Sequence, residues 1–253
     1  MKIFVINLEK DSLKKEAFIK NFNKFNLDYE FIKAVYGKGL SEYELDKLVY
    51  DYKNSFITLG EVGCALSHLK IYQKMINEDI KYALILEDDA LCSDEFLKYL
   101  NQIEQFLKTK KDYELVCMMY KTDEYFKNLT IKISDNINIY KFAKGTGAYG
   151  YIITKEAAKK LIKINTPLIL EADCWVQFFK MDRLKIYCLD KNIIETNDPF
   201  GINSSIGQQR HTLGKQKSRA RKKRLRKFGG IKYLINGLYY RLVYKVFNRS
   251  IGN

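Results

Sequence analysis

Short apolar runs alternate along this chain with longer segments in which apolar residues recur every three or four positions. The short runs predict buried strands, and the longer segments predict helices that bury one face. We predict strands over residues 2–8, 27–35, 83–86, 114–120, 151–153 and 186–189. We predict helices over residues 9–25, 41–48, 58–77 and 94–107, and another helix that Thr154 caps. The alternation predicts an α/β fold with a mostly parallel sheet flanked by helices.

Weaker patterns connect these elements. Residues 121–141 alternate only loosely and predict an irregular hairpin, and the glycine-rich residues 145–150 predict a flexible loop before the next strand. Residues 196–209 are crowded with Asn, Ser and Gly and predict a long loop. We place a domain boundary near Gln209, which separates a body of residues 1–209 from a tail of residues 210–253.

The charge distribution sets this tail apart. The net charge is +14, yet no acidic residue follows Asp198. Of the 44 basic residues, 14 follow Asp198, which leaves 30 to balance the 30 acidic residues of the body. A basic run followed by the apolar, tyrosine-rich residues 231–247 is typical of a helix in a membrane interface. We predict that residues 215–247 dock on an anionic membrane surface. A disordered solubilising arm and a cover over the body are the alternatives, and nucleic-acid binding is disfavoured because no reader module follows the basic run.

The cysteines and the N-terminus indicate a cellular location. Five scattered cysteines without a C-x-x-C pair signal neither a disulfide framework nor a zinc site, which favours a reducing compartment. The apolar stretch at the N-terminus is too short for a signal peptide, and no run of about 18 apolar residues could span a bilayer. We therefore expect a cytoplasmic protein that reaches a membrane only peripherally.

Three consecutive carboxylates follow one predicted strand directly. Glu87, Asp88 and Asp89 come after the apolar residues 83–86, and ligands of open α/β sheets bind at the carboxyl ends of strands. Three adjacent negative charges repel one another, so a cation such as Mn²⁺ or Mg²⁺, which prefers oxygen ligands, would stabilise them. A solvated turn is the simpler alternative. Since side chains alternate along a strand, Glu87 and Asp89 are expected to face one way and Asp88 the other.

Four segments in a fixed order resemble a known family. They are VINL at residues 5–8, LGEVGCALSH at 59–68, LEDD at 86–89 and GTGAY at 145–149. Together they resemble glycosyltransferase family 25, of the bacterial lipooligosaccharide galactosyltransferase type, over about residues 1–206. The resemblance implies a GT-A-like, Rossmann-type fold, a nucleotide-sugar donor, a divalent cation and inversion at the anomeric carbon. One departure is Lys14-Lys15, where relatives often have Arg, which leaves a diphosphate contact there open.

The resemblance, together with the acids, assigns the donor site. Asp89 is expected to bind the metal together with Glu87, and Glu87 or Asp88 is expected to contact the ribose or act through water. Asn7 and Leu8 belong to the first motif and are expected near the nucleotide.

The glycine loop is expected to lie against the donor sugar. Gly145, Thr146 and Gly147 would let backbone approach the sugar closely, because glycine permits unusual dihedral angles. The alternative is a tight connection before the next strand.

The candidate substrate residues are more dispersed. Ser67 and His68 share a motif, although a lone histidine is more often a packing residue. Tyr149 ends the glycine loop, Trp175 could stack on a sugar or lie in the core, and Ser204 sits in a polar loop that could make a last contact.

An inverting transfer also needs a base that removes the proton of the acceptor hydroxyl. We predict Asp173 as this base, with Glu61 as the reserve. The predicted function is transfer of a hexose, galactose by preference, from a UDP-sugar to a lipooligosaccharide acceptor at the inner face of the bacterial inner membrane. A metal-dependent nucleotidyl or phosphoryl transferase and a noncatalytic membrane-associated binding protein are the alternatives.

Overall fold

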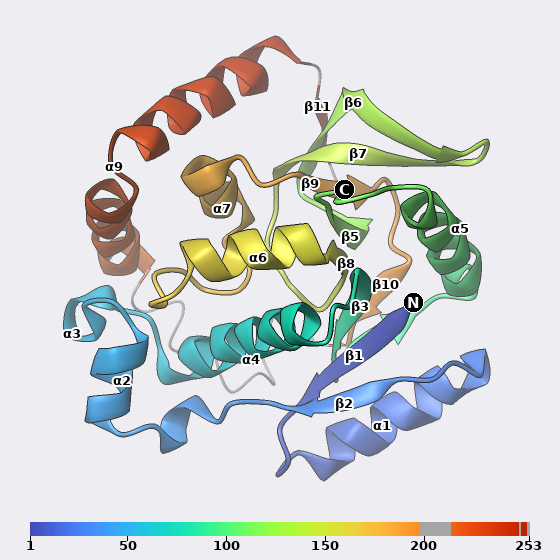
Figure 1. Ribbon diagram of the computed structural model, residues 1–253, viewed down its shortest axis with the longest axis horizontal. Helices are drawn as coiled ribbons and strands as arrows, with labels where there is room; N and C mark the ends of the chain where they lie inside the picture. Colours follow the sequence, from blue (N-terminus) through green and yellow to red (C-terminus); the bar gives the residue numbers. More distant parts are fainter. Residues whose placement is uncertain (198–213, 248, 252–253) are drawn as a thin grey trace.

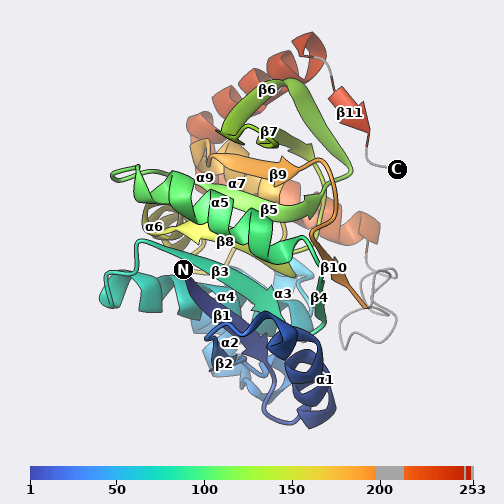
Figure 2. The same ribbon diagram turned by 90° about the vertical axis from the view of Figure 1, so that its right-hand side faces the viewer.

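A nine-stranded sheet forms the centre of the computed structural model, which describes residues 1–197, 214–247 and 249–251. The strand order is β11-β6-β7-β9-β5-β8-β3-β1-β2. Helices cover both faces of this sheet (Figures 1 and 2). The strands are β1 (Lys2–Asn7), β2 (Glu30–Lys33), β3 (Tyr82–Glu87), β5 (Val116–Lys121), β6 (Glu124–Ser134), β7 (Ile137–Lys144), β8 (Gly150–Thr154), β9 (Ile186–Leu189) and β11 (Arg249–Ile251).

Most of these strands run in one direction. The pairs β1–β2, β1–β3 and β5–β9 are parallel, and β8 is antiparallel to both of its neighbours, β3 and β5. Following the pairings across the sheet, β2, β1, β3, β5, β9 and β6 point the same way, and β8, β7 and β11 are reversed. The predicted α/β architecture with a mostly parallel, Rossmann-type sheet flanked by helices is confirmed.

Two apolar layers sandwich the sheet because successive strand residues face opposite sides. Phe4 and Ile6 of β1 join the layer under helices α4, α6 and α7, whereas Ile3 and Val5 join the layer under α1 and α5. The helices are α1 (Ser12–Phe22), α2 (Glu42–Leu48), α3 (Tyr52–Ser55), α4 (Leu59–Asn77), α5 (Phe96–Lys108), α6 (Lys155–Ile164) and α7 (Trp175–Asp182), with short 3-10 turns η1 (Asn23–Phe25) and η2 (Gly37–Gly39).

Two connecting segments also form strands. The irregular hairpin predicted over residues 121–141 is confirmed, because β6 and β7 form a long antiparallel hairpin whose register shifts account for the weak alternation. A second, two-stranded sheet of β4 (Ala90–Cys92) and β10 (Ile194–Thr196) was not predicted, because each strand has three residues and no pattern of its own. This small sheet follows the acidic triplet directly and brings Thr196 opposite Ala90.

The C-terminal segment lies against the body. Helix α9 (Gly214–Val246) changes direction at Gly230, whose backbone is not helical (φ 52°, ψ −143°). It contacts α3 and α7, and β11 then pairs with β6 at the edge of the large sheet (Figures 1 and 2). No helix in the described ranges is long and apolar enough to cross a membrane. Beyond the predicted boundary near Gln209, α9 and β11 thus both contact the body.

Candidate active site

A pocket lies at the carboxyl ends of β1 and β3. Its walls come from the segment after β1, from residues 34–38, from one face of α4, and from the acidic triplet Glu87, Asp88 and Asp89. Because β1 and β3 are parallel, with Ile6 opposite Glu87, the first and third motifs meet at the same edge of the sheet. The structure thus brings Leu8, Ser67, His68 and the three acids together in one pocket.

Asn7 holds the middle acid. Its Nδ2 donates to Asp88 Oδ2 at 2.7 Å and to the backbone oxygen of Asp11 at 3.3 Å. Burial raises the pKa of Asp88, and the bond from Asn7 and the charge of Lys14 oppose this rise. Asn7 is therefore placed to fix a carboxylate of the site and the loop after β1.

Asp89 carries a buried oxygen without a partner. Its Oδ2 accepts from Thr196 Oγ1 at 2.7 Å, whereas Oδ1 is buried and has no hydrogen-bond partner within the described part of the chain. Burial, together with the charge of Glu87, raises the pKa of Asp89 to about 6. A buried acceptor left unsatisfied destabilises a fold, and a divalent cation would satisfy it. The carboxylate donors therefore fit a cation that prefers oxygen, such as Mn²⁺ or Mg²⁺.

A chain of hydrogen bonds leads from the core to Glu87. Tyr72 Oη lies 2.5 Å from Tyr151 Oη, which lies 2.7 Å from His68 Nδ1, and His68 Nε2 lies 3.4 Å from Glu87 Oε1. His68 is 1% exposed, and its hydrogen bonds to Tyr151 and Glu87 hold the buried ring in place. His68 was predicted as a site residue, but the roles of Tyr72 and Tyr151 were not predicted. Tyr72 lies among the apolar residues of α4, and Tyr151 lies in the apolar strand β8.

The start of α4 and residues 35–37 pack against each other without room for side chains. A Cβ at Gly63 would lie 2.4 Å from the backbone oxygen of Val35, and one at Gly37 would lie 1.8 Å from that of Leu59. Ser67 Oγ accepts from Val35 N at 2.8 Å and donates to Gly63 O at 2.7 Å. Ser67 and Gly63 thus fix one wall of the pocket.

The glycine loop is tied to the same site. Glu87 N donates to Tyr149 O at 3.0 Å, and the Tyr149 ring stacks on Tyr120 with centroids 4.2 Å apart. Gly147, at φ +91°, has its oxygen bonded by Tyr120 Oη and by Trp175 Nε1, both at 2.7 Å. Trp175 is 1% exposed, so its observed contact with this loop is from the core side.

The predicted base and its reserve lie in different surroundings. Asp173 is half-buried, and its Oδ2 accepts from Gly147 N at 3.4 Å. Burial raises the pKa of Tyr120, and the charges of Asp173 and Glu87 add to this rise. Glu61 is 1% exposed, completes a capping box with Thr58 at the start of α4, and forms an ion pair with Lys217. Ser204 lies outside the described residues.

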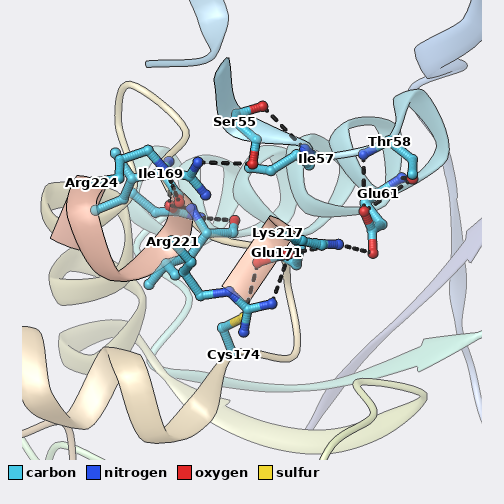
Figure 3. Close-up of polar contacts among 12 residues, drawn as sticks. Ser55, Ile57, Thr58, Glu61, Ile169, Glu171, Cys174, Lys217, Arg221 and Arg224 are labelled. Carbon is cyan, nitrogen blue, oxygen red and sulfur yellow. Dashed lines mark hydrogen bonds and ion pairs between the residues drawn. The ribbon is translucent and has the colours of Figure 1, made fainter. Parts of the chain in front are cut away.

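A buried ionic cluster joins α9 to Glu61 at the start of α4 and to Glu171 (Figure 3). Lys217 of α9 also contacts Glu171 Oε1 at 2.7 Å, and Arg221 contacts the same oxygen at 3.3 Å. Burial alone would raise the pKa of Glu171, but Arg221 and Lys217 outweigh burial and lower it to about 2. Arg224 donates to the backbone oxygens of Ile169 and Ser55, both at 3.0 Å.

The buried roles of Lys217, Arg221 and Arg224 were not predicted, because a basic run usually faces solvent or a charged surface. One signal was available: Glu171 follows the apolar residues 167–170, and a buried acid requires a cationic partner.

Comparison with known proteins identifies the family of this chain. Residues 1–176 match the family described as glycosyltransferase family 25 (LPS biosynthesis protein), and the chain belongs to this family.

The lipooligosaccharide biosynthesis protein lic2B of Haemophilus influenzae is 29% identical over 162 residues, which cover 62% of this chain and 61% of that protein. A putative glycosyltransferase of H. influenzae is 25% identical over 92% of this chain and 86% of its own length. Human procollagen galactosyltransferase 2 is 25% identical over 64% of this chain, and the match spans 27% of its length. The chain thus matches less than two thirds of lic2B and about a quarter of the human protein.

Proposed function

We propose that this protein transfers a hexose, galactose by preference, from a UDP-sugar to the glycan of a lipid-linked lipooligosaccharide-type acceptor, with inversion and with Mn²⁺ or Mg²⁺. The observation that carries the proposal is the buried Oδ1 of Asp89, which has no hydrogen-bond partner among the described residues and lies beside Glu87 and Asp88 at the sheet edge. Two relatives support the choice of reaction, since their names include lipooligosaccharide biosynthesis and galactosyl transfer.

Different residues of the pocket would bind the cation, the nucleoside and the diphosphate of the donor. Asp89 and Glu87 would hold the cation, which when bound neutralises charge on a diphosphate leaving group. Asp88, fixed by Asn7 at 2.7 Å, and the backbone near Leu8 would contact the nucleoside. Lys14 lines the pocket, and its charge opposes the rise that burial causes in the pKa of Asp88 and Asp89, so it can supply a cationic contact to the diphosphate.

The loop of Gly145, Thr146 and Gly147 would position the donor sugar, with Tyr149 beside Glu87. We assign Asp173 as the base, because it adjoins this loop and its carboxylate is half-buried near Tyr120. Glu61 is not used in this scheme, because its carboxylate caps α4 and pairs with Lys217.

The outer face of α9 suits an anionic membrane surface. Its inner face is fastened to the body by hydrogen bonds from Tyr233 to Gln177 and from Asn236 to Lys180. The outer face exposes an apolar row at helical spacing, and basic residues flank it along α9. The apolar row is Ile231, Leu234, Ile235, Leu238, Leu242 and Val246. Docking through this face would place the enzyme on the cytoplasmic side of the inner membrane, beside a lipid-linked acceptor.

A donor panel with the Asp89→Asn variant tests the proposed reaction. The protein is incubated with UDP-hexoses, Mn²⁺ and a lipooligosaccharide acceptor, and the released nucleotide and the product glycan are identified. We expect UDP release and transfer that stop with EDTA and fall at least about 100-fold in Asp89→Asn, as for loss of a catalytic electrostatic contact. The matched control is Asp94→Asn, whose side chain is fully exposed and which should retain activity.

Two outcomes would overturn the proposal. Full activity with EDTA or in folded Asp89→Asn would remove the role of the acids. Release of pyrophosphate or phosphate instead of UDP would favour a nucleotidyl or phosphoryl transferase.

A further inference from the structure

Three side chains of different chemistry converge on the wall of the pocket. Cys64 Sγ, a ring nitrogen of His68 and a carboxylate oxygen of Glu87 all lie within 4.8 Å of one another. Cys64 and His68 are four residues apart on α4, so they project from the same helix face, and Glu87 ends β3. Neither the cysteine count nor a C-x-x-C spacing could indicate this group, because its third donor comes from another element.

The distance between the nitrogen and oxygen donors suits tetrahedral coordination. Bonds of about 2.0–2.1 Å from nitrogen and oxygen to a tetrahedral cation place the two donors roughly 3.4 Å apart, and His68 Nε2 lies 3.4 Å from Glu87 Oε1. Cys64 is half-buried and lines the pocket, and because a zinc–sulfur bond is about 2.3 Å long, coordination would draw its sulfur toward the other two donors. The pocket leaves a direction open for a fourth ligand such as water.

His68 also has the outer contact typical of a metal ligand. Its Nδ1 lies 2.7 Å from Tyr151 Oη, which Tyr72 Oη approaches at 2.5 Å. A ligating histidine commonly donates its second ring N–H to such a partner, which fixes the tautomer and orients the ring. Here Tyr151 Oη would accept a hydrogen bond from Nδ1–H and donate its own proton to Tyr72 Oη, which leaves the Nε2 lone pair directed at Glu87.

We propose that Cys64, His68 and Glu87 form a binding site for a thiophilic divalent cation, Zn²⁺ or its probe Co²⁺, beside the oxygen-only site proposed at Glu87 and Asp89. A thiolate and an imidazole select such cations over Mg²⁺ and Mn²⁺. Binding deprotonates the Cys64 thiol and releases that proton to solvent. If the proposed transfer is correct, Zn²⁺ inhibits it, because Glu87 is shared by both sites.

Cobalt spectroscopy tests the site without any sugar donor. The folded full-length protein is titrated with Co²⁺, and thiolate-to-cobalt charge transfer in the near ultraviolet is recorded. We expect one equivalent to bind, with a band that is absent in Cys64→Ala and an affinity at least tenfold weaker in His68→Ala. Tyr151→Phe should weaken binding about 10- to 100-fold, as for loss of an outer-shell partner. Cys92→Ala is the matched control, because Cys92 is a half-buried cysteine outside the cluster.

The proposal is overturned if the wild-type protein gives no thiolate band, or if Cys64→Ala retains it. Circular dichroism of each variant checks that it is folded. The result is independent of the transfer reaction, since a protein that binds Co²⁺ through Cys64 yet transfers no sugar would contradict only the proposed function.

Discussion

Lys217 in the first turns of α9 forms an ion pair with Glu171, 2.7 Å apart, and both side chains are almost fully buried. The same ammonium group contacts Glu61 at the start of α4. One residue of the basic tail thus joins the two segments that carry Glu61 and Asp173 (Figure 3). The beginning of α9 is therefore part of the interior that supports the pocket.

Replacing Lys217 should destabilise the whole fold. Lys217→Met leaves Glu61 and Glu171 buried without their shared cation, and removing one partner of a buried pair costs about 3–5 kcal/mol. Urea denaturation of wild type and variant measures this free energy of unfolding. The control is Lys215→Met, an exposed position in the same turn, which should change it by less than about 0.5 kcal/mol. A similarly small change for Lys217→Met would contradict a structural role.

Glu171 should make stability depend on pH in the acid range. Its pKa is about 2 in the folded protein against an ordinary 4.5, so the folded state binds fewer protons between these values. The stabilisation is complete above about pH 4.5 and is lost as the pH falls toward 2. A Glu171→Gln variant should therefore show a flatter decline of unfolding free energy over this window, measured by urea denaturation at successive pH values. The exposed Glu16→Gln should follow the wild type, and equal slopes for all three proteins would refute the prediction.

The central part of the fold was predictable because periodicity reports burial. Residues 83–86 are apolar without interruption and form a strand buried on both faces, and the acids after it face the pocket. The motif at residues 59–68 forms α4 with its glycines at a close backbone approach. Each of these features depends on residues that are neighbours in the sequence, so the pattern of those residues is sufficient to predict it.

Features that depend on distant contacts were not predictable. The buried positions of Lys217 and Arg224 contradict the usual exposure of basic runs, and only the acids and carbonyl groups of other segments explain them. The donors at Cys64 and Glu87 likewise meet through the packing of α4 on the sheet. A pattern along one chain reports which face is buried, but it does not report the partner that is buried against it.

Gly63→Ala should weaken binding of the donor nucleotide. The new methyl group would lie 2.4 Å from Val35 O and 2.8 Å from Gly37 N, which forces residues 35–37 away from α4 and displaces a wall of the pocket. We expect UDP affinity, measured by calorimetry with Mn²⁺, to fall at least about tenfold. The control is Gly237→Ala, where nothing lies within 4 Å; alanine there should stabilise the helix by up to about 1 kcal/mol. Unchanged UDP affinity in Gly63→Ala would show that this packing does not shape the donor site.

The second half of α9 should bind anionic vesicles through its outer face. Leu234 and Leu238 are 55% and 59% exposed and one helical turn apart, so Leu234→Gln with Leu238→Gln removes the centre of the apolar row without touching the inner contacts of Tyr233 and Asn236. Burial of one leucine contributes about 1.5–3 kcal/mol, so vesicle cosedimentation should weaken at least about tenfold. Leu13→Gln on α1, which is 79% exposed, should bind as the wild type does. Binding should also weaken with salt and with neutral lipid, because exposed charges are screened. Equal binding to neutral and anionic vesicles, or no effect of the double substitution, would show that this face does not dock on a charged membrane.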